Sequence, residues 1–319
     1  MSKYKSKPFP RDKIKTYPLR SRRSKVSIED FSRPFSPKQE FRRFVESLPD
    51  ILAGKEFKDF LSLMGRAKKK GKAIIFALGA HVIKVGLNPV IINLMEEGWI
   101  TGLALNGAGI IHDFEIALAG HTSEDVGDQI KDGQFGMAEE TGDLLNKAIN
   151  SLKKKDMGLG EGVGELIAHS NFPHKDLSVL GAAYRLNIPT TIHVAIGTDI
   201  IHFHPLANGE SIGKASLRDF FLFCSLLEDL DGGGVFVNIG SAVILPEVFL
   251  KGVSYVRNRG VLLDDFSTAV FDFNQHYRPY QNVVKRPLGK KGRGFYFIGH
   301  HEIMIPLLAA SLRSIPNNK

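Results

Sequence analysis

The chain has 319 residues, a formal net charge of +8, 43% hydrophobic residues and one cysteine, Cys224. A single cysteine excludes an intramolecular disulfide, and no apolar run approaches the roughly 20 residues that a membrane helix needs. The length allows one large α/β domain or two smaller ones.

The excess positive charge is concentrated at the N-terminus. Residues 1–25 contain ten Lys or Arg residues and one acid, Asp12, so the rest of the chain sums to −1. A nucleic-acid interface needs basic residues spread over a folded surface with aromatic residues between them. The distribution argues against nucleic acid as a partner, and the lack of an apolar leader predicts a cytoplasmic protein.

The N-terminal part is predicted to be irregular and then helical. Residues 1–37 are expected to form a basic arm, and residues 38–319 a single domain. Four apolar side chains at the end of the arm could dock on a neighbouring subunit: Val26, Ile28, Phe31 and Phe35. Apolar stripes between residues 38 and 70 predict two helices separated by Pro49.

From residue 72 onward, apolar runs alternate with helical patterns. Six runs are candidates for strands, and at least five strands are expected from them: 72–78, 99–106, 188–196, 235–239, 268–274 and 294–299. Helices are expected at about 112–120, 137–154, 217–230 and 243–256, and the four glycines between 158 and 164 are interpreted as a loop. The alternation predicts a doubly wound, mostly parallel, Rossmann-like α/β sheet with an N-terminal helical extension.

The stretch from Thr101 to Glu115 is typical of a ligand-binding strand–turn–helix unit. A buried strand ends at Asn106, Gly107-Ala108-Gly109 follows, and His112-Asp113 opens a helix. Glycines let a ligand approach the backbone, and a helix N-terminus carries partial positive charge. The dinucleotide-binding fingerprint GxGxxG is absent, so the residues alone predict a nucleotide-sized ligand and no more.

Polar residues follow most of the predicted strands, and they would share one edge of a parallel sheet. The turns expected there contain Gly79, Gly107, Gly197, Gly240, Asn274 and Gly299. If His202 and His204 were on a strand, both rings would lie on one face, as metal ligands or as a proton-handling pair. Local spacing fixes no third metal ligand.

Several segments in this order resemble deoxyhypusine synthase over roughly residues 40–315. They are IIFALGAHVIKVG, LALNGAGIIHDFE, IPTTIHVAIGTDIIHFH, GSAVILPEVF and FYFIGHHEIMIPLLAASL. The resemblance implies a Rossmann-like fold and a homotetramer with sites between subunits. It also implies that NAD oxidises spermidine, that an imine forms on a lysine, and that an aminobutyl group passes to an amine acceptor.

The resemblance also suggests roles for individual residues. Residues 106–109 and Asp113 would contact NAD, together with Gly79, Gly240, Ser241 and Asn274. Asp199 and His300 would bind the polyamine, and His204 or His112 would move protons. No residue is assigned to a metal.

The lysine of the family's tryptophan-glycine-lysine motif has no direct counterpart here. The segment reads NVVKRPLGKKGRG, so Lys285 is the nearest candidate nucleophile and Lys84 a second one. An imine-forming lysine must be neutral to attack, and a neighbouring cation such as Arg286 favours the neutral form. Two alternatives stay open: a metal-assisted enzyme that uses the strand-end histidines, and a non-catalytic protein that keeps only the fold and the tetramer.

Overall fold

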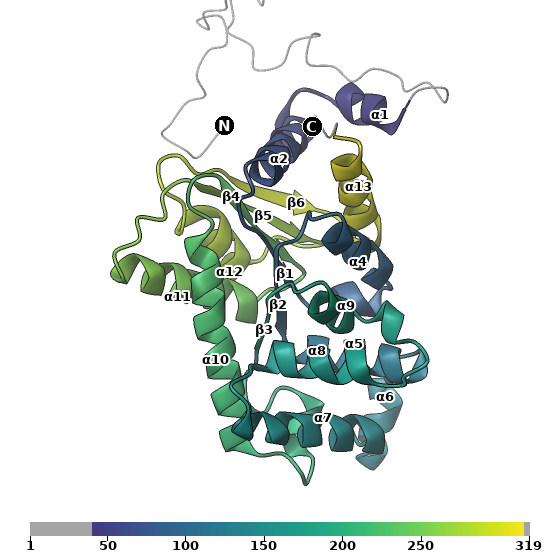
Figure 1. Cartoon of the computed structure of the whole chain (residues 1–319). Helices are drawn as coiled ribbons and strands as arrows, with labels where there is room; N and C mark the ends of the chain where they lie inside the picture. The colour runs from purple at the N-terminus through teal and green to yellow at the C-terminus, as the bar shows by residue number, and fades with distance from the viewer. Residues whose placement is uncertain (1–39, 316–319) are drawn as a thin grey trace, which may run out of the picture.

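The computed structural model describes residues 40–315, and its centre is a six-stranded sheet with helices on both faces (Figure 1). The strands are β1 (Ile74–Leu78), β2 (Gly102–Asn106), β3 (Thr190–His193), β4 (Gly234–Ile239), β5 (Phe266–Asp272) and β6 (Gly294–Ile298). Their order is β3-β2-β1-β4-β5-β6, and all neighbouring pairs are parallel. The predicted doubly wound parallel sheet is confirmed. The predicted arm, residues 1–37, lies outside the described residues.

The α-helices connect these strands and cover the sheet. They are α1 (Phe41–Ser47), α2 (Leu52–Lys69), α3 (His81–Lys84), α4 (Asn88–Glu96), α5 (Gly107–Ala119), α6 (Val126–Gln129), α7 (Glu139–Ser151), α8 (Leu159–His169), α9 (Val179–Arg185), α10 (Gly209–Glu228), α11 (Ile244–Asn258), α12 (Tyr277–Pro279) and α13 (His301–Arg313). Two short segments also matter for the site: the 3₁₀ turn η7 (Ile200–Phe203) and the π-helical segment η8 (Tyr280–Lys285).

Both faces of the sheet are buried, which explains why the strands read as continuous apolar runs. In β1, Phe76 and Leu78 belong to one core with α2, α4, α5, α8, α9 and α13. Ile75 and Ala77 point to the other core, which contains α10, α11 and η8.

The N-terminal helices predicted on either side of Pro49 are confirmed, and α2 is part of the main core. Phe60 of α2 is fully buried, and its ring centre lies 5.8 Å from that of Phe271 and 5.7 Å from those of Phe295 and Phe297. The extension therefore covers the β5 and β6 end of the sheet.

Several predicted boundaries were wrong: α10 begins at Gly209 and not at 217, and β3 covers only Thr190–His193 of the run 188–196. Helix α5 begins at Gly107, not at His112, because Asn106 caps it by accepting a hydrogen bond from the Gly109 N–H at 3.0 Å. The glycines between 158 and 164 begin α8 and do not form a loop. They permit close packing: a Cβ on Gly160 would lie 2.1 Å from the Thr190 carbonyl oxygen, and one on Gly162 would lie 2.4 Å from Leu152.

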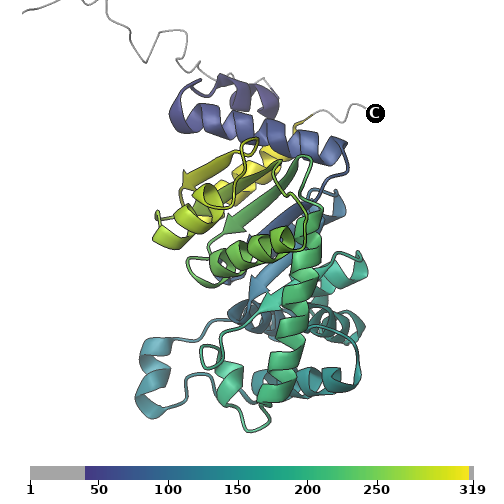
Figure 2. The same ribbon diagram turned by 90° about the vertical axis from the view of Figure 1, so that its left-hand side faces the viewer.

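Between β2 and β3 the chain forms a helical cluster, α5 to α9, that extends beyond the sheet (Figure 1). The long α10 runs from this cluster along the sheet (Figure 2). Its side chains pair with the outer edge of β3. Asp219 accepts from the Ile192 N–H at 2.8 Å, and Ser216 donates to the Ile192 carbonyl at 3.1 Å. In the part of the chain that the structure describes, no helix is long and apolar enough to cross a membrane.

Candidate functional site

The carboxyl ends of all six strands meet at one edge, and the strand order reverses between β1 and β4. Ligands of open α/β sheets bind at such a reversal. Here the turns after β1 and β4 touch each other. The Gly79 N–H donates to the Ile239 carbonyl at 2.8 Å, and a Cβ on Gly79 would lie 2.2 Å from the Gly240 carbonyl oxygen. The missing side chain at Gly79 is thus explained by backbone packing within the chain.

A cluster of aromatic rings lies beside this reversal. The buried His301 ring is 5.3 Å from that of His81, and the half-exposed Phe273 ring is 6.1 Å from His301 and 6.2 Å from His81. Gly240 has a φ of 65°, and a Cβ there would lie 2.7 Å from His301 Cε1. Gly240 therefore leaves room for the imidazole.

His301 presents an unpaired acceptor at this point. Its Nε2 lies 3.3 Å from the Phe271 carbonyl oxygen. A carbonyl only accepts, so in the neutral ring Nε2 carries the hydrogen and Nδ1 does not. Burial lowers the pKa of His301, and its Nδ1 is buried without a hydrogen-bond partner. A buried acceptor without a partner is uncommon in folded proteins and marks this point as a candidate for ligand contact.

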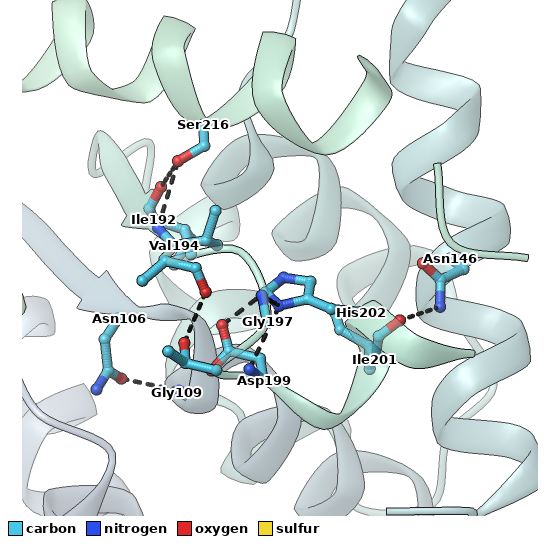
Figure 3. Close-up of polar contacts among 12 residues, drawn as sticks. Asn106, Gly109, Asn146, Ile192, Val194, Gly197, Asp199, Ile201, His202 and Ser216 are labelled. Carbon is cyan, nitrogen blue, oxygen red and sulfur yellow. Dashed lines mark hydrogen bonds and ion pairs between the residues drawn. The ribbon is translucent and has the colours of Figure 1, made fainter. Parts of the chain in front are cut away.

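The ends of β2 and β3 form a second group around Asp199 (Figure 3). Its carboxylate lies against the first residue of α5, because a Cβ on Gly107 would be 1.9 Å from Asp199 Oδ2. Burial raises the pKa of Asp199 to about 6. Oδ2 is buried and accepts no hydrogen bond from any residue in the 40–315 range.

His202 faces the same carboxylate. Its Nδ1 accepts from the N–H groups of Gly197 at 3.2 Å and Asp199 at 3.3 Å, so Nε2 carries the hydrogen. Nε2 lies 3.8 Å from Asp199 Oδ2, too far for a hydrogen bond, and is buried without a partner. Burial lowers the pKa of His202, which favours the neutral ring. Asp199 and His202 thus form an unsatisfied acceptor–donor pair.

The strand that would have aligned His202 with His204 is not formed. Residues 200–203 form η7, and the His204 ring packs on α7, where a Cβ on Gly142 would lie 2.3 Å from it. The two rings therefore point to different neighbours. Within residues 40–315, no three or more His, Cys, Asp or Glu side chains are grouped so that they could hold a metal ion.

His112 and Asp113 lie inside α5 and point to different surroundings. His112 is partly buried, and its Nδ1 is 2.7 Å from Thr122 Oγ1. Burial, helped by the charge of Lys84, lowers the pKa of His112 to about 4. Asp113 is fully buried and turned toward the N-terminus of α9.

Four donors surround the Asp113 carboxylate: Ser178 Oγ, Asn88 Nδ2 and the N–H groups of Val179 and Leu180. Burial nevertheless raises its pKa to about 6. All of these partners are protein groups, and three of them lie at the N-terminus of α9. Asp113 therefore fixes the N-terminus of α9 to α5. Asp113 lies within α5 and not near its start, and its carboxylate faces the protein interior.

Lys285 is not brought to this edge. It is the last residue of η8 and is exposed. The carbonyl of the preceding Val284 lies against Gly294, the first residue of β6, where a Cβ would be 2.4 Å away. Four residues of strand, about 13 Å, separate that end of β6 from its carboxyl end. Lys84, by contrast, closes α3 directly after β1.

The remaining predicted residues lie at the edge with mixed exposure. Ser241 is buried, and its carbonyl accepts from Asn238 Nδ2 at 3.0 Å. Asn274 is exposed, and its carbonyl accepts from the Tyr296 hydroxyl at 2.8 Å. His300 is exposed at the N-terminus of α13.

Sequence reasoning missed three groups around these residues. The first is Thr122, which contacts His112, together with Glu115, which accepts from Thr122. Only the i,i+3 spacing of His112 and Glu115 indicated that these two side chains lie close together. His193, at the end of β3, is buried beside the Phe223 ring. Asp219 lies on an apolar helix face. An acidic residue at such a position indicates a buried carboxylate that accepts hydrogen bonds.

The larger hollows lie elsewhere. A groove of about 670 Å³ is bordered by α1, α2, Trp99 and the end of α13. Another of about 760 Å³ lies between the start of α8, the end of α9 and Thr190. Neither groove is lined by a residue predicted for the site. The candidate site is therefore located by the unpaired polar groups at the strand ends and not by the size of a cavity.

The described chain is thus a Rossmann-like α/β protein with buried, unsatisfied polar groups at its ligand edge. No protein-family model matches the sequence, and no curated protein is similar to it. Solved structures do share the fold. A protein named as a deoxyhypusine synthase from Entamoeba histolytica has a TM-score of 0.52 and 13% identity, covering 89% of this chain and 96% of its own.

Two further solved structures are similar to this chain. AgrE, solved with ornithine and NAD+, has a TM-score of 0.52 and 17% identity over 89% of this chain, which spans 35% of AgrE. An LOR/SDH protein from Methanococcus maripaludis S2 has a TM-score of 0.50 and 16% identity over 87% of this chain and 71% of its own. At these identities the likeness establishes the fold.

Proposed function

We propose that this chain is an NAD-dependent enzyme that oxidises an amine at the carboxyl edge of its sheet. The substrate class is a polyamine such as spermidine, and the further step is transfer of an aminobutyl group to an amine acceptor. The observation that carries the proposal is Asp199 Oδ2, a buried carboxylate oxygen without a partner among the described residues. An ammonium group supplies the missing positive charge and hydrogen bond.

The comparisons support the same substrate class. AgrE binds ornithine, which carries two amino groups, together with NAD+. Asp199 ends a segment that resembles the one carrying the polyamine-binding aspartate of deoxyhypusine synthase, which supports its role here. The ligands of AgrE thus support the substrate class, and the sequence resemblance alone supports Asp199 as the residue that binds the amine.

The edge offers acceptors that fit a dinucleotide. His301 Nδ1 is a buried, unpaired acceptor at the reversal of strand order, and ribose hydroxyl and carboxamide groups donate hydrogen bonds. The exposed face of Phe273 beside it can stack on a planar ring. When bound, NAD supplies the hydride acceptor for oxidation of the carbon next to the amine nitrogen.

The chain's own residues bind and deprotonate the amine in this proposal. Asp199 holds the amine that is not oxidised, and its burial strengthens that attraction. His112, neutral at physiological pH, accepts the proton that leaves the reacting nitrogen. Of the two lysine candidates for imine formation, Lys84 follows β1 at this edge, and Lys285 lies near the opposite one.

We place the site between subunits of a homotetramer. Large apolar side chains ring the carboxyl edge and are strongly exposed in the single chain: Ile196 (64%), Phe203 (52%), Val243 (50%), Phe273 (47%) and Ile303 (64%). Exposed apolar surface of this extent is typical of an interaction face.

Calorimetry of NAD binding, with and without spermidine, tests the proposal, followed by a search for reduced-nicotinamide absorbance. We expect NAD to bind and spermidine to cause reduction. Asp199→Asn should abolish the spermidine effect, whereas Asp229→Asn, at the exposed end of α10, should not. NAD binding without reduction would indicate a different substrate. Absence of NAD binding would mean that this chain shares only the fold with the NAD-binding proteins it resembles.

A further inference from the structure

We infer that Glu115 and Thr122 are positioning residues that fix the tautomer of His112, so that its Nε2 is presented to the ligand as a hydrogen acceptor. The inference deepens the proposed function, because the ligand is the amine proposed above. The arrangement of the three side chains, however, can be tested without any ligand.

The hydrogen atoms in this network can be assigned from the donors available. Thr122 Oγ1 lies 2.5 Å from Glu115 Oε2 and 2.7 Å from His112 Nδ1. A carboxylate only accepts, so the single hydroxyl hydrogen of Thr122 points to Glu115. The contact with His112 then needs a hydrogen on the ring. His112 therefore carries its hydrogen on Nδ1, and Nε2 has a free lone pair.

A third side chain fixes the carboxylate from a different helix. Buried Thr141 of α7 donates to Glu115 Oε1 at 3.0 Å. The same helix anchors the segment that follows Asp199, because Asn146 Nδ2 donates to the Ile201 carbonyl at 3.0 Å (Figure 3). Helix α7 thus links the His112 network to the Asp199 segment, so the two groups are held relative to each other.

The surroundings keep the imidazole neutral. Burial lowers its pKa to about 4, and the charged groups that face it are Lys84 from α3 and Glu115 from its own helix. No group of residues 40–315 forms a hydrogen bond with Nε2, and the ring is partly exposed. The chemistry of such an acceptor suits a ligand that donates an N–H or O–H group, and an amine nitrogen losing a proton is one.

Nuclear magnetic resonance of the full chain with ¹⁵N-labelled histidine tests the assignment directly. We expect His112 to show a protonated Nδ1 and an unprotonated Nε2 between pH 6 and 8. Thr122→Val should move the hydrogen to Nε2, and Thr122→Ser should restore the original pattern. Ser151→Ala, which removes an exposed hydroxyl from α7, is the matched control and should leave the His112 signals unchanged. A protonated Nε2 in the unmodified chain, or no change in Thr122→Val, would overturn the inference.

A second measurement tests the role toward the ligand. Adding NAD and spermidine should shift the His112 Nε2 signal, and Thr122→Val should lower kcat by about 100-fold with little change in KM. If Nε2 does not shift although spermidine binds, the ligand role is wrong. If neither NAD nor spermidine binds, the proposed function fails, while the tautomer result stands or falls on the spectra of the free protein.

Discussion

The Asp199 carboxylate occupies the position that a side chain at residue 107 would take, since a Cβ on Gly107 would lie 1.9 Å from Asp199 Oδ2. The acid is thereby held at the N-terminus of α5, in a position that only glycine leaves open. The partial positive charge of the helix end favours the carboxylate, and burial opposes it. Gly107 therefore affects any ligand of Asp199 even without touching it.

Replacing Gly107 by alanine should weaken spermidine binding at least 10-fold, because the carboxylate must move away from its place. Stability should fall as well, because the displaced carboxylate belongs to a buried aspartate that caps η7. Calorimetry and urea unfolding measure the two effects. Gly213→Ala in the exposed part of α10 has free space and should stabilise the fold by about 0.5–1 kcal/mol without affecting binding. Unchanged binding in Gly107→Ala would contradict the role of this contact.

Two buried aspartates should respond oppositely to substitution by asparagine. The pKa of Asp199 in the folded chain is raised to about 6, so its contribution to stability is present at low pH and is lost as the pH rises from about 4 through 6. Asp199→Asn should therefore be about 1–2 kcal/mol more stable than the unmodified chain at pH 8, and no more stable at pH 4.

Asp113→Asn should be less stable at pH 8 by about 2 kcal/mol, although the pKa of Asp113 is also raised to about 6. Its carboxylate receives hydrogen bonds from four donors, and an amide cannot accept at both positions. Urea unfolding of both variants at pH 4 and pH 8 gives the comparison. Stabilisation by Asp113→Asn would show that burial of its charge outweighs its hydrogen bonds.

Asp219→Ala should lower the free energy of unfolding by about 2–4 kcal/mol. It would leave the N–H groups of Ile192 and Gly160 unpaired inside the protein, each at a cost of about 1–3 kcal/mol. Amide hydrogen exchange at Ile192 should accelerate in this variant. Asp219→Asn keeps an accepting oxygen and should lose much less, so equal losses in the two variants would disprove the edge-pairing role.

His193 should contribute to loss of stability in acid. Burial lowers its pKa to about 3, so the unfolded chain takes up a proton that the folded chain does not, and stability falls as the pH drops below about 6.5. His193→Gln should reduce the loss between pH 7 and pH 4 by about 2–3 kcal/mol. The exposed His121→Gln is the control and should follow the unmodified chain in the same denaturant titration.

The sheet could be predicted because β1, β2, β4 and β5 are buried on both faces, and such strands read as short apolar runs followed by turns. The edge could be predicted for the same reason, since parallel strands place all their following turns together. The start of α5 could not, because Gly107 and Gly109 are poor helix formers. The Asn106 cap and the space left for Asp199 and Leu105 outweigh that preference.

The polar contacts of the site depend on long-range packing that local spacing does not encode. Thr122 and Thr141 reach Glu115 from separate parts of the helical cluster, and nothing in their own neighbourhood marks them. The spacing of His202 and His204 left open whether the two rings share a face, and only the 3₁₀ turn capped by Asp199 shows that they do not. Lys285 is followed by the cation Arg286, which made it a candidate nucleophile. Only the path of η8 shows that Lys285 lies near the start of β6, opposite the carboxyl edge.

The use of Asp219 and Ser216 along β3 limits how copies of this protein can associate. An uncovered outer strand can recruit a strand from another molecule, which leads to extended assemblies or aggregation. At β3 that route is closed, because α10 would have to detach before a new strand could pair with Ile192. A sheet continuing from one copy into the next would therefore have to begin at the other outer strand, β6.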